Sequence, residues 1–232
     1  MAIGCTHGVY ADQTAIDTVL AFADRWKPER RIHLGDVGDY AAFRTGAKGT
    51  KDEAAELEPD SAAVVSLIER YAPTDLLIGN HDLRIWRATT AINAITAKAA
   101  QALRNEFLTA CDKVGANVID TYDINRSYLR IADTLFLHGF MYGEQALRDH
   151  AEHFGRCVHA HWHKPGIAHG RRADHPTAFC VGTLADIEKL EYANTRRATA
   201  AWGQAFTFGE YNDTHCTVNL CERQGDEWRL PL

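Results

Sequence analysis

Apolar residues in the first half of the chain recur alternately at helical spacing and in short runs typical of buried strands. Three stretches fit helical spacing and end at Pro28, Pro73 and Gly115, which are residues that stop helices. These predicted helices span Ile16–Trp26, Val64–Tyr71 and Ile92–Val114, and Asp12 or Thr14 is expected to cap the first. The short apolar runs predict strands over Met1–Gly4, Arg31–Leu34 and Asp75–Ile78.

The second half is richer in strand patterns. They cover Asn117–Tyr122, Ser127–Ile131, Thr134–His138, Cys157–His161 and Ala178–Thr183, with one predicted helix at Glu144–Phe154. Two further runs, Ala205–Glu210 and Cys216–Glu222, predict a hairpin that turns at Tyr211–Asp213. Alternation followed by a meander predicts an α/β sandwich of two mixed β-sheets flanked by helices. We expect residues 1–232 to form one domain, because the chain contains no clear linker.

Composition narrows the class of protein. The chain has 232 residues, of which 46% are hydrophobic, and a formal net charge of −6, so tight non-specific binding to nucleic acid is not expected. We find no secretory signal, no run of about 20 apolar residues that would span a bilayer, and no C-x-x-C pair among the six Cys. The sequence therefore predicts a cytoplasmic protein with reduced thiols and no membrane partner.

Residues of the types that bind metals follow several predicted strands. The clusters are Cys5-Thr6-His7, Gly35-Asp36-Val37-Gly38-Asp39, Gly79-Asn80-His81-Asp82, His138-Gly139 and Ala160-His161-Trp162-His163. Any one of them alone is more often an ordinary turn or a surface pair. Their occurrence together, in order and each after a strand, favours a functional site, because loops at strand ends form sites in α/β folds.

The clusters resemble the motif series D-x-H, G-D-x-x-D, G-N-H-D/E, H and G-H-x-H of the calcineurin-like metallophosphoesterases. Two positions depart from it: Cys5 stands at the first Asp, and Ala160 stands at the Gly of the last motif. Ala160–Pro165 parallels the family's G-H-T-H-x-P, so His161 and His163 are aligned with the two His of that motif. The resemblance covers the whole chain and implies the calcineurin-like sandwich. Gly182-Thr183-Leu184, Tyr192 and Trp202 further resemble the tails of small phage and prophage members.

The resemblance implies a site for two divalent transition metal ions, with Mn, Zn, Fe or Ni as candidates. One metal would be held by Cys5, His7, Asp36 and His163, and the other by Asp36, Asn80, His138 and His161. Asp36 would bridge the two ions. A pair bridged in this way is suited to in-line displacement at phosphorus.

The same resemblance implies hydrolysis of a phosphate ester by a metal-bridging hydroxide. His81 would act as general acid on the leaving oxygen, and Asp39 would orient it. Arg84 is a candidate contact for a phosphate oxygen, with a surface salt bridge as the alternative. Asp82 is expected to be structural, and His150 and His153, three apart on a predicted helix, are expected at the surface.

Cys5 leaves three interpretations open: a thiolate ligand that favours softer metals, a non-ligand that weakens the first metal site, or a replacement introduced into this chain. The expected substrate is a phosphodiester, or a broad range of mono- and diesters. The alternatives are a small nuclease, in which nucleic acid enters only as substrate, and a degenerate member that binds metal or a phosphoryl ligand without efficient turnover. The sequence makes no prediction of oligomeric state.

Overall fold

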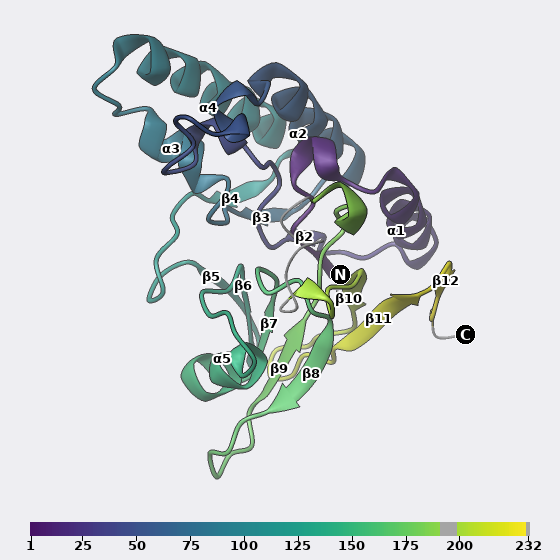
Figure 1. Cartoon of the computed structure of the whole chain (residues 1–232). Coiled ribbons are helices and arrows are strands. Elements are labelled where there is room, and N and C mark those ends of the chain that lie inside the picture. The colour runs from purple at the N-terminus through teal and green to yellow at the C-terminus, as the bar shows by residue number, and fades with distance from the viewer. Residues whose placement is uncertain (191–198, 231–232) are drawn as a thin grey trace.

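The computed structural model describes residues 1–190 and 199–230, and within them the strands form two mixed sheets (Figure 1). The seven-stranded sheet has the order β12-β11-β10-β1-β2-β3-β4, in which β1 to β4 are parallel. Its strands are β1 (Ala2–Ile3), β2 (Ile32–His33), β3 (Asp75–Leu77), β4 (Asn117–Ile119), β10 (Ala205–Phe208), β11 (Asn219–Gln224) and β12 (Glu227–Trp228).

The five-stranded sheet has the order β5-β6-β7-β9-β8 and is parallel only through β6, β7 and β9. Its strands are β5 (Tyr128–Ile131), β6 (Thr134–Leu137), β7 (Cys157–His159), β8 (Gly166–His169) and β9 (Thr177–Cys180). The predicted fold class, two mixed sheets flanked by helices, is therefore confirmed.

Helices cover the outer face of each sheet. Those described are α1 (Gln13–Trp26), α2 (Leu57–Tyr71), α3 (Leu83–Ala88), α4 (Ala94–Val114) and α5 (Ala146–Phe154), and single 3-10 turns occupy Gly8–Tyr10, Ala41–Phe43, Lys51–Ala54 and Ile187–Lys189. In Figure 1, α1 to α4 lie on the side of the seven-stranded sheet and α5 lies against the other sheet. No helix in the described ranges combines the length and the apolar character needed to cross a bilayer.

Strand alternation divides the core into layers. Leu76 and Ile78 pack outward against the helices of the first sheet, whereas Leu77, between them, packs inward against the second sheet. The inward layer also contains Phe136 and Phe179 from the five-stranded sheet. The two sheets thus share one buried interface, and every parallel strand of the first sheet delivers its carboxyl end to the same edge of that interface.

Local chemistry explains the helix ends. The Asp12 carboxylate accepts hydrogen bonds from the amides of Thr14 and Ala15 and so caps α1. Gly115 ends α4 with φ 73°, as predicted from its position after the apolar pattern. Ala72, before Pro73, ends α2 in the same left-handed region.

Several predicted boundaries were wrong. The strand predicted over Cys157–His161 ends at His159, because His161 has a left-handed backbone with φ 61°. The elements β8, β12 and α3 were not predicted. Tyr192, which carried part of the tail resemblance, lies outside the described residues.

Candidate metal centre

The predicted clusters converge at the carboxyl edge of the parallel strands. Cys5 follows β1, Asp36 follows β2, Asn80 follows β3, His138 follows β6 and His161 follows β7. Loops from both sheets therefore meet at one place. This is the edge at which ligand sites form in open α/β sheets.

The loops carry an unusual concentration of left-handed backbone at residues other than glycine. Cys5, His7, Asp36, His161 and His163 have φ values of 53°, 54°, 53°, 61° and 61°. Each such residue costs on the order of 1 kcal/mol, and such residues cluster where a surrounding structure fixes side chains for function.

One group of candidate ligands comprises Cys5, His7, Asp36 and His163, whose donor atoms all lie within 4.8 Å of one another. These four side chains are buried. His7 Nε2 faces His163 Nε2 at 3.1 Å, and His7 Nδ1 faces the Asp39 carboxylate at 3.2 Å. If Nδ1 of His7 donates to Asp39, its Nε2 carries a lone pair that points into the group.

A second group comprises Asp36, His138 and His161, again with donor atoms within 4.8 Å of one another. His138 Nδ1 donates to the Leu34 carbonyl at 2.8 Å, which directs Nε2 toward Asp36 Oδ2 at 3.2 Å. Asn80 Oδ1 lies 3.2 Å from the same His138 nitrogen. Asp36 belongs to both groups, so the structure brings all seven predicted metal ligands together around one shared carboxylate.

The electrostatics suit cations. Burial and neighbouring imidazoles lower the pKa of His161 to about 3 and that of His163 well below its ordinary value, so both are neutral and have lone pairs to donate. Burial opposes ionisation of Asp36, but His138 and His81 outweigh it and hold the pKa of Asp36 well below its ordinary value. Neutral His161 and His163 beside an ionised Asp36 form a donor set that fits divalent transition metals. Burial opposes protonation of His138, but the Asp36 carboxylate outweighs it and raises the pKa of His138, so a cation bound there would displace the proton on its Nε2.

Cys5 is the exception in this donor set. Burial and the Asp36 carboxylate raise its pKa well above the ordinary thiol value. Its Sγ accepts a hydrogen bond from the amide of His161 at 3.2 Å. The thiol is therefore neutral unless a cation replaces its proton, which is how metal binding releases protons from cysteine sites.

A third group lies beside the first two and reaches the surface. His81 Nδ1 lies 2.6 Å from Asp39 Oδ1, and the His81 side chain is 15% exposed. Burial opposes ionisation of Asp39, but hydrogen bonds with His7 and His81 hold its pKa well below the ordinary value. Arg84 Nη1 donates to the Asp39 carbonyl at 2.5 Å, and its Nη2 lies 3.3 Å from His81 Nε2. Asp39 thus orients both His81 and Arg84.

Two buried carboxylates fix the loops without joining the ligand groups. Asp82 accepts hydrogen bonds from the amides of Val37, Gly38 and Gly79, which ties the Asp36 loop to the Asn80 loop. This agrees with the structural role expected for Asp82.

Asp60 does the same from α2 and was missed by the sequence analysis. It accepts from the amides of Val9, Asp39 and Tyr40. In the sequence it stands among other acidic residues of a polar stretch, and no local signal distinguishes it.

The expectation that His150 is exposed was wrong. Its ring is buried and stacks on His159, with ring centroids 3.8 Å apart. His150 Nδ1 donates to the Ala146 carbonyl, and Nε2 accepts from the Phe140 amide. The pair therefore packs α5 onto β7 behind the metal centre, whereas His153 is exposed as expected.

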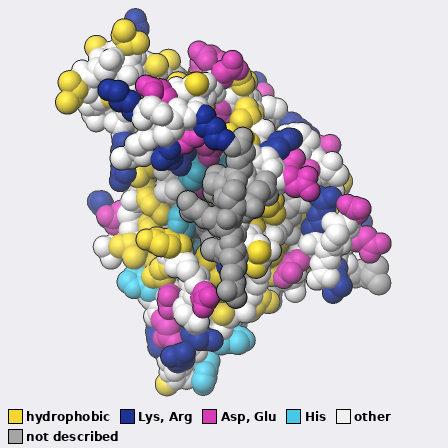
Figure 2. All heavy atoms as spheres, viewed as in Figure 1, with side chains coloured by type: hydrophobic (Ala, Val, Ile, Leu, Met, Phe, Trp, Pro, Cys, Tyr) yellow, Lys and Arg dark blue, Asp and Glu magenta, His cyan; other side chains and the backbone are white. Residues whose placement is uncertain are grey.

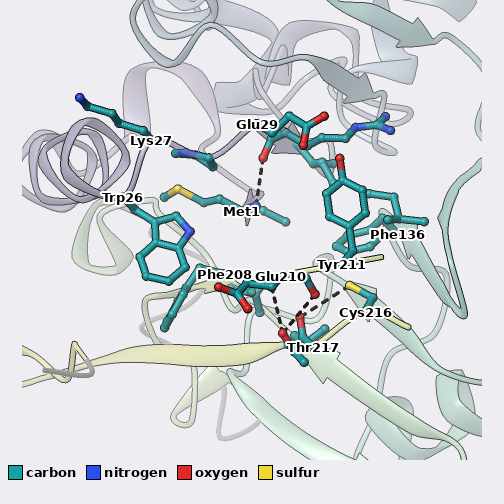
Figure 3. A pocket seen from close by; sticks show the side chains of 18 residues that line it. Met1, Trp26, Lys27, Glu29, Phe136, Phe208, Glu210, Tyr211, Cys216 and Thr217 are labelled. Atoms are coloured by element: carbon teal, nitrogen blue, oxygen red, sulfur yellow. Dashed lines mark hydrogen bonds between the residues drawn. The ribbon is translucent and has the colours of Figure 1, made fainter. Parts of the chain in front are cut away.

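A hollow of about 600 Å³ adjoins the centre and is lined in part by Asp39, His81 and Arg84. Another cavity, of about 410 Å³, lies near the amino ends of β1 and β2, where Trp26 and Tyr211 flank it and Phe136 and Phe208 line it (Figure 3). None of the predicted site residues lines this second cavity. Of these two cavities, the hollow beside His81 is therefore the one that adjoins the candidate metal centre.

Two phage proteins resemble the chain over most of its length. The Gene 54 protein of Mycobacterium phage D29 is 24% identical over 240 residues, which cover 95% of this chain and 91% of that protein. The Gene 54 protein of Mycobacterium phage L5 is 23% identical with the same coverage of 95% and 91%. No protein-family model matches the chain.

Solved structures also share part of the arrangement. YfcE, a phosphoesterase from E. coli, matches with a TM-score of 0.43 and 14% identity, over 89% of this chain and 85% of that one. A single mutant of Vps29 from Entamoeba histolytica matches with a TM-score of 0.36 and 10% identity, over 72% and 86% of the two chains.

Proposed function

We propose that the chain is a metal-dependent phosphoesterase of the calcineurin-like type. The observation that supports this most strongly is the position of Asp36, whose carboxylate belongs to two separate groups of candidate ligands. A carboxylate shared by two cation sites is the arrangement used for in-line displacement at phosphorus. Cys5, His7, Asp36 and His163 would hold one cation. The ligands of the second would be Asp36, Asn80, His138 and His161.

Cations bound there would supply Lewis acidity toward the phosphoryl oxygens. The chain's own residues supply proton transfer and orientation. His81 is fixed through Nδ1 by Asp39, so when protonated it presents the Nε2 proton toward the hollow and can donate it to a leaving oxygen. Arg84 Nη2 lies 3.3 Å from that nitrogen. A phosphate oxygen placed beside Nε2 would thus be within reach of the guanidinium as well.

The first test is hydrolysis of bis(p-nitrophenyl) phosphate, with p-nitrophenyl phosphate as the matched monoester, by protein loaded with Mn²⁺ or Zn²⁺. We expect metal-dependent release of nitrophenol that disappears after chelation and in the Asn80→Ala variant. Metal content per chain, measured by elemental analysis on the same samples, separates the alternatives. Two ions with turnover support the proposal, and two ions without turnover with either ester would indicate the degenerate binding protein.

A value near one ion per chain would indicate that the Cys5 side binds weakly. No bound ion after loading with either metal would refute the metal centre. The Cys5→Asp variant is the control for weak binding at the Cys5 side, because it restores the carboxylate of the motif series at that position.

A further inference from the structure

The hollow beside the metal centre has a chemical character of its own. Besides Asp39, His81 and Arg84, its lining includes Tyr10, Ala41, Arg44, Lys51, Asp52, Ala55, Lys189 and Leu190. These residues come from four separate segments: the turn after β1, the 3-10 turns that follow β2, the loop after β3, and the 3-10 turn at Ile187–Lys189. In Figure 2, Lys and Arg side chains lie next to His side chains near the middle of this face.

Positive charge prevails in the lining although the whole chain has a net charge of −6. The lining contains four cationic side chains and two carboxylates, those of Asp39 and Asp52; the cations are Arg44, Lys51, Arg84 and Lys189. Both carboxylates are already engaged, since Asp39 pairs with His7, His81 and Arg84, and Asp52 pairs with Arg44 Nε at 2.5 Å. An anion entering the hollow would therefore meet cationic donors without meeting an unpaired carboxylate.

Arg44 and Lys189 line the hollow and belong to none of the groups of candidate ligands. Arg44 uses Nε for Asp52 and Nη1 for the Thr45 carbonyl, while its side chain stays 41% exposed. Lys189 pairs with Asp186 at 3.1 Å and stays 59% exposed. Both can turn a donor toward a bound anion. Beside them, Tyr10 packs with the buried Leu190 and provides an apolar wall.

We infer that this hollow binds a second phosphoryl group of the substrate, one that is not cleaved. The inference rests on the proposed function, because it places the scissile phosphate at Arg84 and His81. The substrate class is then a phosphate ester with a further phosphate on the group beyond the scissile bond. A simple ester has only the scissile phosphate, for which the single charge of Arg84 would suffice. Arg44, Lys51 and Lys189 would then have no phosphate to bind.

A smaller hollow, which also includes Arg84 in its lining, supports a substrate that extends to both sides of the scissile phosphate. It measures about 340 Å³, and Asn80, Arg84 and Arg87 line part of it. Arg84 lines both hollows, and the 3-10 turn Ala41–Phe43 separates them, with Ala41 on one side and Phe43 on the other. An ester held at Arg84 thus has room for a substituent on each side.

Equilibrium binding tests this independently of turnover. Isothermal titration of the metal-loaded protein would compare thymidine monophosphate with thymidine bisphosphate, which differ by one phosphate. We expect the bisphosphate to bind about tenfold more tightly. The Arg44→Gln/Lys189→Gln double variant should reduce that preference to about twofold, whereas Lys113→Gln, which removes one positive charge at the far end of α4, should keep it.

Equal affinity of the wild type for the two ligands would overturn the inference, and so would an unchanged preference in the double variant. Hydrolysis is assayed on the same samples. A preference for the bisphosphate without hydrolysis would reject the proposed function but retain the phosphate subsite. Hydrolysis without that preference would retain the proposed function but reject the subsite. Competition by a short oligothymidylate and by a bisphosphorylated sugar then identifies which source of the second phosphate the hollow accepts.

Discussion

The backbone amide of His161 donates a hydrogen bond to Cys5 Sγ at 3.2 Å. The two departures from the phosphoesterase motif series, Cys5 and Ala160, therefore lie together although they are 155 positions apart in the sequence. The Cβ of Ala160 also limits the space beside Gly4, where an added Cβ would lie only 2.8 Å away. The two loops are packed as a unit, so a change at Cys5 is expected to act on the His161 loop as well.

We predict that Cys5 is a thiolate ligand. Wild-type protein loaded with Co²⁺ should show a near-ultraviolet thiolate-to-cobalt absorption band, because a coordinated thiol loses its proton. Cys5→Asp should lack the band and should shift the relative affinity from Zn²⁺ toward Mn²⁺ by about tenfold, since a carboxylate is a harder ligand. Cys216→Ala, in the tail, is the matched control and should keep the band. A wild-type spectrum without it would show that Cys5 does not bind the metal.

A second prediction concerns His81 as proton donor. His81→Ala should lower kcat by about 100-fold to 10,000-fold on an alkyl ester, whose leaving oxygen needs a proton. The loss should be much smaller on a p-nitrophenyl ester, whose leaving group departs as a stable anion. Steady-state kinetics on the two esters measure the difference. His153→Ala, an exposed histidine on α5, is the control. Equal losses on both esters would contradict the role in proton transfer.

The sequence was most informative where strands deliver residues to the site. Cys5, Asp36, Asn80 and His138 each follow an apolar run, and parallel strands bring such ends to one edge, so their convergence could be predicted from order alone. By contrast, the strand β8 and the helix α3 are short and lack a distinct periodicity. Their formation depends on pairing with β9 and packing against α4.

Burial of single polar residues was harder to predict. His150 is buried because its ring stacks on His159 from a different element, and Asp60 because three amides of two distant loops converge on its carboxylate. Both depend on tertiary partners that local patterns do not specify. Trp202, which carried part of the tail resemblance, lies with its ring centroid 4.4 Å from that of His163.

A third prediction tests how closely the Gly79 backbone approaches the candidate metal ligands Asp36 and His138. A Cβ at Gly79 would lie 2.2 Å from Asp36 Oδ1 and 2.7 Å from His138 Cε1. Gly79→Ala should therefore displace Asp36 and lower metal content below one ion per chain, as measured by elemental analysis after loading. In Gly166→Ala, on the edge strand β8, the new Cβ would meet only the end of the Leu147 side chain at 3.3 Å. That variant should bind metal normally. Normal metal content in both would argue against Asp36 as the shared ligand.

A fourth prediction concerns the carboxylate that ties these loops together. Burial and the nearby Asp36 raise the pKa of Asp82 to about 7, while its oxygens accept from three backbone amides. Asp82→Ala should lower the free energy of unfolding by about 3 kcal/mol or more, because the amides lose their acceptors. Asp82→Asn should cost less, because it keeps one acceptor oxygen and removes the repulsion from Asp36. Urea denaturation measures both. Asp226→Ala, at a fully exposed position, is the control. A cost no larger than that of the control would show that this clamp does not stabilise the fold.

The last prediction concerns pH and the contact between α1 and the C-terminal strands. Partial burial opposes ionisation of Asp12, but hydrogen bonds from Gln204 and two helix amides, together with Arg223, hold its pKa below the ordinary 3.8. Asp12→Asn keeps the helix cap and loses the charge paired with Arg223 Nη1 at 2.9 Å.

Because the folded-state pKa of Asp12 is lowered, the stability that its charge supplies is present above pH 3.8 and is lost as the pH falls through the folded-state pKa. The wild type should thus be more stable than Asp12→Asn at neutral pH. Urea denaturation measures the difference in unfolding free energy, which should vanish below the folded-state pKa of Asp12. Asp213→Asn, exposed in the hairpin turn, is the control for loss of one negative charge. A difference that persists in acid would mean that Asp12 acts through its shape and hydrogen bonds rather than through its charge.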